Sequence, residues 1–411
     1  MRGTRSRSPA TVPATPTSAG AAPGGTRRRR LTGVDAARGL ALLGMMAIHI
    51  LPSWNEDGDP TLVWSAFSGV AATLFALLAG LTLAFLTGGS RPLSGGALTA
   101  SRAGLLVRAA LIAVLGMLLA AVDPPAAIIL VYYGVMFLLA IPLLRLSARA
   151  LAALAVGIAV LGPILVHLTR DVLPDLSGYD PTLTTLFTEP VTFLSVVLFT
   201  GSFPVIPWMA YVCAGLALGR LDLRDKRTAL RLFAAGVLTA LGAWLTSALL
   251  QGPLGGREQL MAATPWSATE IQDFLIWGPL PELPTTTWWW LTVLAPYTAA
   301  PFEVFHSLGV AAAALGAMLL IGRFAGRALR PLTAIGSMTL TLYSAHLLLL
   351  ATGLLAQAPW ASFIVQTTAA VGFAMIWLHF KDSGPLERGV TVATRAVRDR
   401  VYTRIQRKAP G

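Results

Sequence analysis

The stretch RLTGVDAARGLALLGMMAIHILPSW, residues 30–54, combines a long apolar run with three ionisable side chains. The run is long enough to cross a bilayer as a helix, which takes about 20 predominantly apolar residues. It nevertheless contains Asp35, Arg38 and His49. Because ionisable groups are costly in hydrocarbon, we expect these three side chains to face the interior of a helical bundle rather than lipid.

The composition of the whole chain indicates a membrane protein built from helices. Of its 411 residues, 55% are hydrophobic and 12% are charged, with a mean hydropathy of +0.68. Soluble domains carry about twice that charged fraction. Cys213 is the single cysteine, so the sequence offers neither a disulfide framework nor a cysteine-based metal site, and it contains no other metal-binding motif. We predict an all-α, polytopic membrane protein that binds no metal.

The net charge of +12 resides in the two ends of the chain. Residues 1–30 hold seven arginines and no acidic residue, and residues 380–411 hold eight basic and three acidic residues. Such tails suit anionic lipid headgroups better than nucleic acid. We therefore predict a disordered basic cytoplasmic tail at 1–30, a transmembrane domain at 31–380 and a basic cytoplasmic tail at 381–411, with the lipid bilayer and no nucleic acid as partner.

Ten apolar segments of roughly 18 residues or more predict ten transmembrane helices. They lie near residues 33–52, 66–87, 103–121, 126–144, 149–168, 191–219, 229–250, 302–322, 332–355 and 361–379. With the N-terminus inside, the inner loops hold thirteen basic and two acidic residues, and the outer loops two and thirteen. By the positive-inside rule both termini are cytoplasmic, and we predict a multi-pass protein of the bacterial cell membrane.

The longest outer segment, residues 251–301, contains the run TTTWWWL. We expect this segment to form interfacial helices. We also expect Trp288, Trp289 and Trp290 to form an aromatic belt at the membrane surface, in preference to a binding platform.

Helix geometry places the three ionisable residues of the first span on one face. At about 100° per residue, Asp35, Arg38 and His49 fall within roughly 60° of one another, and His49 lies roughly 16 Å from Arg38 toward the outside. A simpler interpretation is a first-turn acid, a snorkelling arginine and an interfacial imidazole. A stripe that runs from inside to outside suits chemistry linking the two compartments, so we predict a cavity along it, extending inward from Arg38 and outward from His49.

Several stretches resemble known membrane acyltransferases. RLTGVDAARGLALLGMMAIH is similar to the first span of the transmembrane acyltransferase superfamily, and Arg38 and His49 match the Arg-(ten residues)-His spacing of its acyltransferase-three branch. VDAARGLALLGM, FALLAGLTLAFLTGG, GSFPVIPWMAYVCAGLALGR, APYTAAPFEVFHSLGVA and GSMTLTLYSAHLL resemble a second branch, which holds heparan-α-glucosaminide N-acetyltransferase and the YeiB-like bacterial proteins. The likeness covers most of residues 31–380.

This resemblance implies an acyltransferase, most simply an acetyltransferase, with acetyl-CoA or another acyl-CoA as co-substrate. The heparan enzyme carries its catalytic histidine in the outer loop after the first span, but residues 50–66 contain no histidine here. The imidazole must then come from His49 or from His346 on the ninth span. We take His49 as the general base, with His346 and Tyr343, which lies three residues before it, as further catalytic candidates.

Arginines on the inner side are candidates for binding the donor. Arg38, oriented by Asp35, lies near the inner end of the first span, and the Gly/Ser-rich loop TGGSRPLSGGALTASR carries Arg91 and Arg102 and leads to Arg108. Guanidinium groups suit the phosphates of coenzyme A. A flexible linker carrying positive-inside charge is the alternative for this loop.

The interpretation we prefer is transfer of an acyl group from cytoplasmic acyl-CoA to an extracytoplasmic hydroxyl or amine, on a glycan, glycolipid or small molecule. A transporter or flippase that uses Asp35, Arg38 and His49 as its path is the alternative, and a non-catalytic membrane scaffold is a third. A homodimer is the assembly to test. The sequence fixes neither the acceptor nor the acyl chain length.

The charge asymmetry of the loops yields a topology prediction. In a Cys213→Ala background, single cysteines introduced within 251–301 should react with an impermeant thiol reagent from outside, because this segment is predicted to be extracytoplasmic. A cysteine near Arg224 should react only after the membrane is opened. External labelling near Arg224 would contradict this topology.

Overall fold

The computed structural model describes residues 31–279 and 283–408. Across these ranges the chain is helical and holds no β-strand, apart from an isolated bridge between Trp54 and Pro60. The all-α class predicted from composition is thereby confirmed. The predicted disordered tail at 1–30 lies outside the described residues.

Seven helical segments among the described residues are long and apolar enough to cross a membrane. They are α1 (Thr32–Ile50), α2 with α3 (Leu62–Phe67 and Val70–Leu86), α4 (Gly95–Ala120), α6 (Ala148–Thr169) with η2 (Arg170–Val172), α10 (Lys226–Gln251), α13 (Pro301–Phe324) and α16 (Pro359–Phe380). The polytopic membrane class is thus supported by length and composition.

Two bent helix pairs raise the number of candidate spans to nine if each pair crosses once. The first joins α8 (Pro190–Ser195) and η3 (Val196–Thr200) to α9 (Val205–Leu218) with a bend of 53°, and the second joins α14 (Arg330–Gly336) to α15 (Thr339–Ala351) with a bend of 81°. The break before α9 contains Pro204, which cannot donate a backbone hydrogen bond.

The remaining predicted span contains α5 (Leu130–Ala140), followed by η1 (Pro142–Arg145). A helix of 11 residues covers about 16 Å, roughly half of the hydrocarbon thickness. Each of the ten predicted segments therefore contains a helix. Ten complete crossings and the cytoplasmic location of both termini remain predictions.

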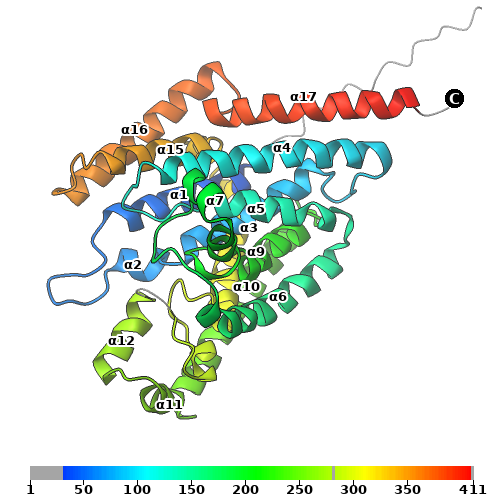
Figure 1. Ribbon diagram of the computed structural model, residues 1–411. Helices are drawn as coiled ribbons and strands as arrows, with labels where there is room; N and C mark the ends of the chain where they lie inside the picture. The colour runs from blue at the N-terminus through cyan, green and yellow to red at the C-terminus, as the bar shows by residue number, and fades with distance from the viewer. Residues whose placement is uncertain (1–30, 280–282, 409–411) are drawn as a thin grey trace, which may run out of the picture. The chain divides into compact units, whose positions relative to one another are not determined.

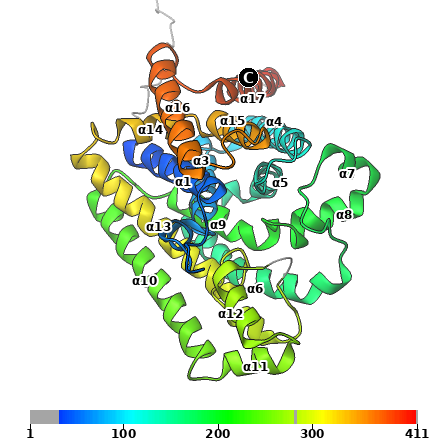
Figure 2. The same ribbon diagram turned by 90° about the vertical axis from the view of Figure 1, so that its left-hand side faces the viewer.

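Helix α1 packs against α3, α13, α14 and α16 (Figure 2). Its sequence is rich in alanine and leucine, which favour helix, and it ends at Ile50, shortly before Pro52. Most of its residues between Gly33 and Ala47 are buried. Because α1 is largely surrounded by other helices, its polar side chains face other parts of the protein or cavities.

Glycines allow the helices around α1 to approach one another closely. Gly39 of α1 faces the carbonyl of Leu332 in α14, and Gly336 of α14 faces the carbonyl of Asp35 in α1, so the two helices run antiparallel with their backbones in contact. Such small-residue contacts are typical of membrane helix pairs, where association depends on close packing. The parallel pair α3–α9 and the antiparallel pair α10–α13 also meet through glycines.

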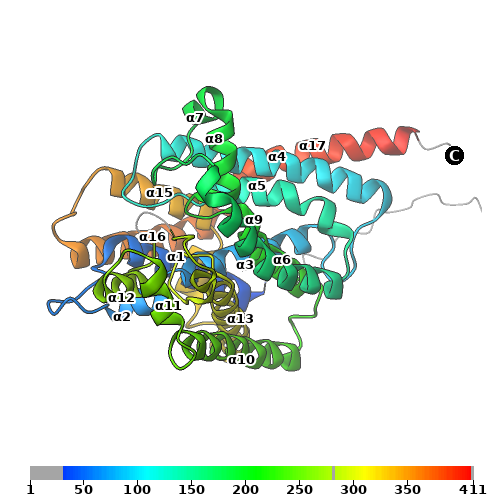
Figure 3. The ribbon, with the colours of Figure 1, turned by 60° about the horizontal axis from the view of Figure 1, so that its bottom comes forward.

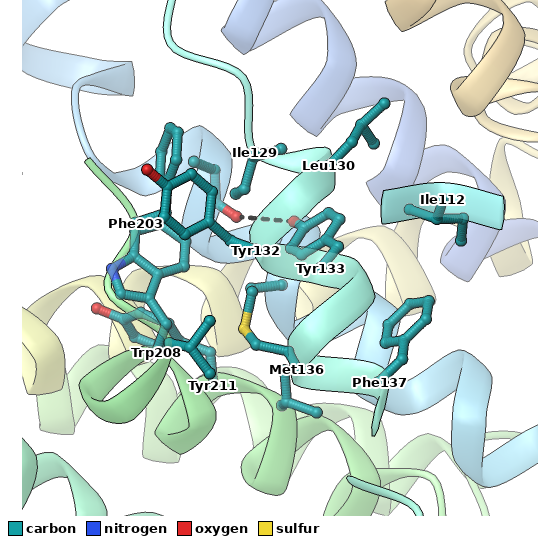
Figure 4. Packing of buried hydrophobic residues seen from close by; sticks show 14 of the residues in the cluster. Ile112, Ile129, Leu130, Tyr132, Tyr133, Met136, Phe137, Phe203, Trp208 and Tyr211 are labelled. Carbon is teal, nitrogen blue, oxygen red and sulfur yellow. Dashed lines mark hydrogen bonds between the residues drawn. The ribbon is translucent and has the colours of Figure 1, made fainter. Parts of the chain in front are cut away.

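A large aromatic cluster fills the space between α5 and α9 (Figure 4). Phe203 makes edge-to-face contacts with Tyr132 and with Trp208, a geometry that aromatic pairs prefer. The hydroxyl of Tyr133 donates a hydrogen bond of 3.5 Å to the carbonyl of Ala72 in α3. This cluster fixes α5 against the bent α8–α9 pair.

The predicted basic tail contains α17 (Pro385–Lys408), which lies antiparallel along α4 (Figures 1 and 3). Cβ atoms built at Gly96 and Gly104 of α4 would meet Ile405 and Thr394 of α17. At the start of α17, Glu387 accepts hydrogen bonds from the backbone N–H and the hydroxyl of Thr341 at the start of α15. The sequence-based prediction located the charge but missed this helix.

The segments predicted to be outer fold into short helices. They are α7 (Leu183–Thr188), α11 (Gly256–Ala263) and α12 (Ala268–Trp277), shown in Figure 3, and η4 (Trp288–Thr292). Helices within 251–301 are as predicted. The aromatic belt is wrong for Trp290, which is fully buried against Phe274 and donates to the hydroxyls of Thr264 and Thr286. Three adjacent tryptophans cannot share one face of a helix, and this one forms part of a small separate core.

The contact between α1 and α14 predicts an asymmetry between two glycine substitutions. Gly336→Ala should destabilise the protein by about 1–3 kcal/mol, because the added Cβ would overlap the Asp35 carbonyl. The matched control is Gly372→Ala in α16, where nothing lies within 4 Å and alanine should be neutral or stabilise by up to about 1 kcal/mol. Thermal unfolding of both variants in detergent tests this, and equal unfolding temperatures would contradict it.

Candidate functional site

The polar stripe of α1 begins with an ion pair. Arg38 Nη1 donates to Asp35 Oδ1 at 2.7 Å, and Arg38 Nη2 donates to the hydroxyl of Thr82 in α3 at 2.7 Å. Thr82 in turn donates to the carbonyl of Leu78. The guanidinium is thereby held in one orientation by a carboxylate and a hydroxyl, as the spacing of Asp35 and Arg38 suggested.

Arg38 lines an inner cavity of about 220 Å³. The charged groups on its wall are Arg38, Arg108 and Glu387, and the rest is mostly apolar and aromatic, including Phe75, Tyr133 and Tyr343. The Nε of Arg108 is buried without a hydrogen-bond partner. A guanidinium with an unsatisfied N–H beside a cavity is suited to binding an anionic group there.

His49 and His346, the two candidate imidazoles, lie in direct contact. His49 Nδ1 and His346 Nε2 are 3.1 Å apart, and the rings are nearly parallel, with a centroid distance of 5.4 Å. A hydrogen bond between two imidazole nitrogens requires one to donate a proton and the other to accept it. The first and ninth predicted spans, 297 residues apart, therefore share one histidine pair.

The pair continues into α16. His346 Nδ1 lies 2.8 Å from Gln366 Oε1, and Gln366 Nε2 donates to the hydroxyl of Ser362 at 3.1 Å. His346 is 2% exposed and Gln366 8%. Ser362 and Gln366 were not among the residues singled out from the sequence, although their spacing of four places them on one helical face.

An outer cavity of about 340 Å³ lies beyond His49. Its wall includes Arg170 and Asp175, together with the aromatic side chains of Trp64, Tyr179, Trp277 and Tyr297. A smaller cavity of about 30 Å³ shares His49, Phe203 and Tyr297 with it, and shares Met45, Ile129 and Tyr343 with the inner cavity. Cavities therefore lie beside both Arg38 and His49, as predicted, whereas the side of the membrane that each faces stays a prediction.

Tyr343 lies at the junction of these cavities, since it lines both the inner and the small one. Its hydroxyl donates to the carbonyl of Ala127 at 3.4 Å, near the upper limit for a hydrogen bond. Ala127 itself lines the small and the outer cavity. Tyr343 thus lies between the cavity that Arg38 lines and the cavities that His49 lines.

The remaining candidates lie elsewhere. Arg91 and Arg102 are absent from the lining of the inner cavity, whereas Arg108 is part of it. Glu303, 5% exposed, accepts from Ser307, and together with His306 it lines a separate cavity of about 250 Å³ beside Trp64. Among the described residues there is no group of three or more side chains that could hold a metal ion.

The comparison with known families bears on this geometry. A model of the family described as heparan-alpha-glucosaminide N-acetyltransferase, catalytic, matches residues 30–249, which is more than half of the chain. The chain belongs to this family. No curated protein matches the chain.

The match to the N-acetyltransferase family begins just before α1 and ends within α10. It includes Asp35, Arg38, Arg108 and His49, and with them most of the inner cavity. Tyr343, His346 and Gln366 lie beyond its end. This family shows the chain to be related to membrane N-acetyltransferases, which is the class that the sequence resemblance indicated.

A buried carboxyl of an outer loop predicts a pH-dependent stability. Asp180 Oδ2 accepts from the backbone N–H of Ile128, beside the cavity-lining Ala127, at 2.8 Å. Burial raises the pKa of Asp180 to about 7, although the hydrogen bond from Ile128 lowers it. Because the folded state keeps this proton while the unfolded chain loses it near pH 4, the free energy of unfolding should fall as pH rises from about 4 to about 7.

Asp180→Asn keeps a carbonyl acceptor for Ile128 and removes the charge. We expect this variant to match the wild type near pH 4 and to be more stable above pH 7, when thermal unfolding in detergent is measured across this range. Asp273→Asn, at an exposed position, is the control and should leave the pH dependence unchanged. An Asp180→Asn protein with the full wild-type slope would contradict the assignment.

Proposed function

We propose that the protein is a membrane acetyltransferase that carries an acetyl group from cytoplasmic acetyl-CoA to a hydroxyl or amine on the outer side. One observation carries this proposal. In a chain of the N-acetyltransferase family, three cavities that share lining residues extend from Arg38 on α1 and Arg108 on α4 to His49 at the end of α1.

The inner cavity is the proposed donor site. Arg38 and Arg108 offer guanidinium groups to a phosphate or carbonyl of the donor, and Glu387 limits the positive charge beside them. The apolar wall around Phe75 and Tyr133 suits an extended thiol-bearing arm. In this arrangement the thioester reaches the small cavity, beside Tyr343 and His49.

The outer cavity is the proposed acceptor site. Aromatic faces of Trp64, Trp277 and Tyr297, with the charged pair Arg170 and Asp175 on the wall, suit a sugar or another polar acceptor. The family's name refers to a glucosaminide. We therefore propose an amino sugar, a glycan or a glycolipid as the acceptor class.

His49 is the proposed general base. His346 has both ring nitrogens engaged, by His49 and by Gln366, whereas His49 uses only Nδ1 and lines both the small and the outer cavity. Its Nε2 accepts the proton of the acceptor as the acceptor's oxygen or nitrogen attacks the thioester carbonyl. The carbon–sulfur bond then breaks, and the proton passes from His49 to the departing thiolate. We assign Tyr343 to the oxyanion: its single hydroxyl proton, which makes a long hydrogen bond to the Ala127 carbonyl, would turn to the oxyanion in the reaction.

This mechanism predicts different losses at two positions on α1. His49→Ala should lower the rate of acetyl transfer at least about 10²-fold while acetyl-CoA still binds, because a general base acts on the transfer step. Arg38→Ala should weaken acetyl-CoA binding first. Purified protein in nanodiscs, with acetyl-CoA as donor and glucosamine as probe acceptor, allows both the release of free thiol and donor binding to be measured.

The control for these variants is His379→Ala, an exposed position at the end of α16. If His49→Ala transfers at the wild-type rate and His346→Ala does not, His346 is the base instead. Movement of a solute through proteoliposomes without acetyl-CoA, and no thiol release with it, would favour the transporter.

A further inference from the structure

Half of the residues of helix α16 are exposed, and its buried residues are few. They are Ser362, Gln366 and Ala374. Two of the three are polar, four residues apart, and both belong to the hydrogen-bonded chain that ends at the histidine pair. Burying an amide and a hydroxyl is costly unless they form hydrogen bonds. Their burial on a helix with few buried residues therefore indicates a specific role for these two side chains.

The directions of the hydrogen bonds along this chain define the tautomer of each imidazole. Ser362 Oγ accepts from Gln366 Nε2, which leaves Gln366 Oε1 as an acceptor toward His346. His346 therefore carries its proton on Nδ1, and its Nε2 has a lone pair. That lone pair accepts a proton from His49 Nδ1, so the lone pair of His49 lies on Nε2, the nitrogen that His346 does not occupy.

We propose that Gln366 is a positioning residue that sets the tautomer of His346, and through it the tautomer of His49, so that His49 Nε2 is kept as the base. Ser362 Oγ accepts from Gln366 Nε2, which leaves Oε1 facing His346. This inference rests on the proposed function, because it assigns the base's supporting groups within the same reaction. Gln366 lines none of the inner, small and outer cavities.

Hydrogen bonding between helices is the alternative role for Gln366 and Ser362, since polar side chains hold membrane helices together. If their role is only structural, loss of Gln366 or Ser362 should lower the stability of the protein and leave the tautomers of the histidines unchanged. The positioning role makes a further demand, because loss of the acceptor oxygen allows His346 to hold its proton on Nε2. His49 would then hold its proton on Nε2 and lose its function as a base toward the acceptor.

Two substitutions at one position separate these roles. Gln366→Met removes the acceptor with little change in volume, and kcat for acetyl transfer should fall on the order of tenfold to hundredfold, with KM for acetyl-CoA unchanged. Gln366→Glu keeps an oxygen acceptor and adds a negative charge, so transfer should persist. The acid limb of its kcat/KM profile should move to higher pH, because a carboxylate favours the imidazolium form.

The other ionisable groups near the pair remain unchanged in both variants. Those on the walls of the outer and small cavities are Arg170, Asp175, Tyr179, Tyr297 and Tyr343. Gln357→Met, at an exposed position before α16, is the matched control and should retain the wild-type kcat and profile. Full kcat in Gln366→Met, or an unmoved acid limb in Gln366→Glu, would overturn the positioning role and leave only the structural one.

A measurement without turnover distinguishes failure of this inference from failure of the proposed function. Imidazole nitrogen shifts of ¹⁵N-histidine-labelled protein in lipid report each tautomer directly, and signals are assigned by their loss in His49→Gln and His346→Gln. We expect both residues to carry the proton on Nδ1 in the wild type, and on Nε2 in Gln366→Met. An Nε2-protonated His346 in the wild type would overturn the inference, whatever the activity of the protein.

Discussion

The free-energy cost of burying ionisable groups among apolar helices determines how the helices at the centre of this protein pack. Arg38 is held by Asp35 and Thr82, and His49 is held by His346. Each partner lies on α1 itself or on a helix packed around it. The positions of α3 and α15 therefore depend on the contacts that they make with Arg38 and His49 of α1. Since an unpaired group in this environment costs several kcal/mol, the polar contacts select one packing of the bundle among the many that apolar surfaces alone would allow.

Close backbone contact makes these polar pairs attainable. Gly39 and Gly336 bring α1 and α14 together at the level of Asp35, while the bend between α14 and α15 redirects the chain so that His346 reaches His49. The same elements therefore set the distance between the arginine end and the histidine end of the path. A cavity bounded by close-packed backbones changes its width little, which favours a fixed route for a donor over a gated one.

Periodicity and charge predicted the parts of the fold that depend on local sequence. All ten apolar segments contain helices, and the stripe of Asp35, Arg38 and His49 follows directly from 3.6 residues per turn. Contacts between distant segments were beyond such reasoning. His346 was a candidate by its residue type, but its pairing with His49 depends on the bend at Ser337 and Met338, which no local pattern specifies. Gln366 was missed because an isolated amide in an apolar helix has no signature of its own, and α17 was missed because its apolar positions are spread among arginines.

The division of the site along the sequence has a mechanistic consequence. The matched region, residues 30–249, contributes Arg38, Arg108 and His49 to the cavity walls. The helices that follow contribute His346 and Gln366, which face the base, and Glu387, which lies beside the arginines. In the proposed mechanism the first part of the chain supplies the arginines and the base. The second part adds Tyr343, Trp277 and Tyr297 to the cavity walls and places His346 and Gln366 behind His49. If His49 is the base, as we propose, the later helices matter for its function, because an imidazole can carry its proton on either ring nitrogen and His346 selects between them.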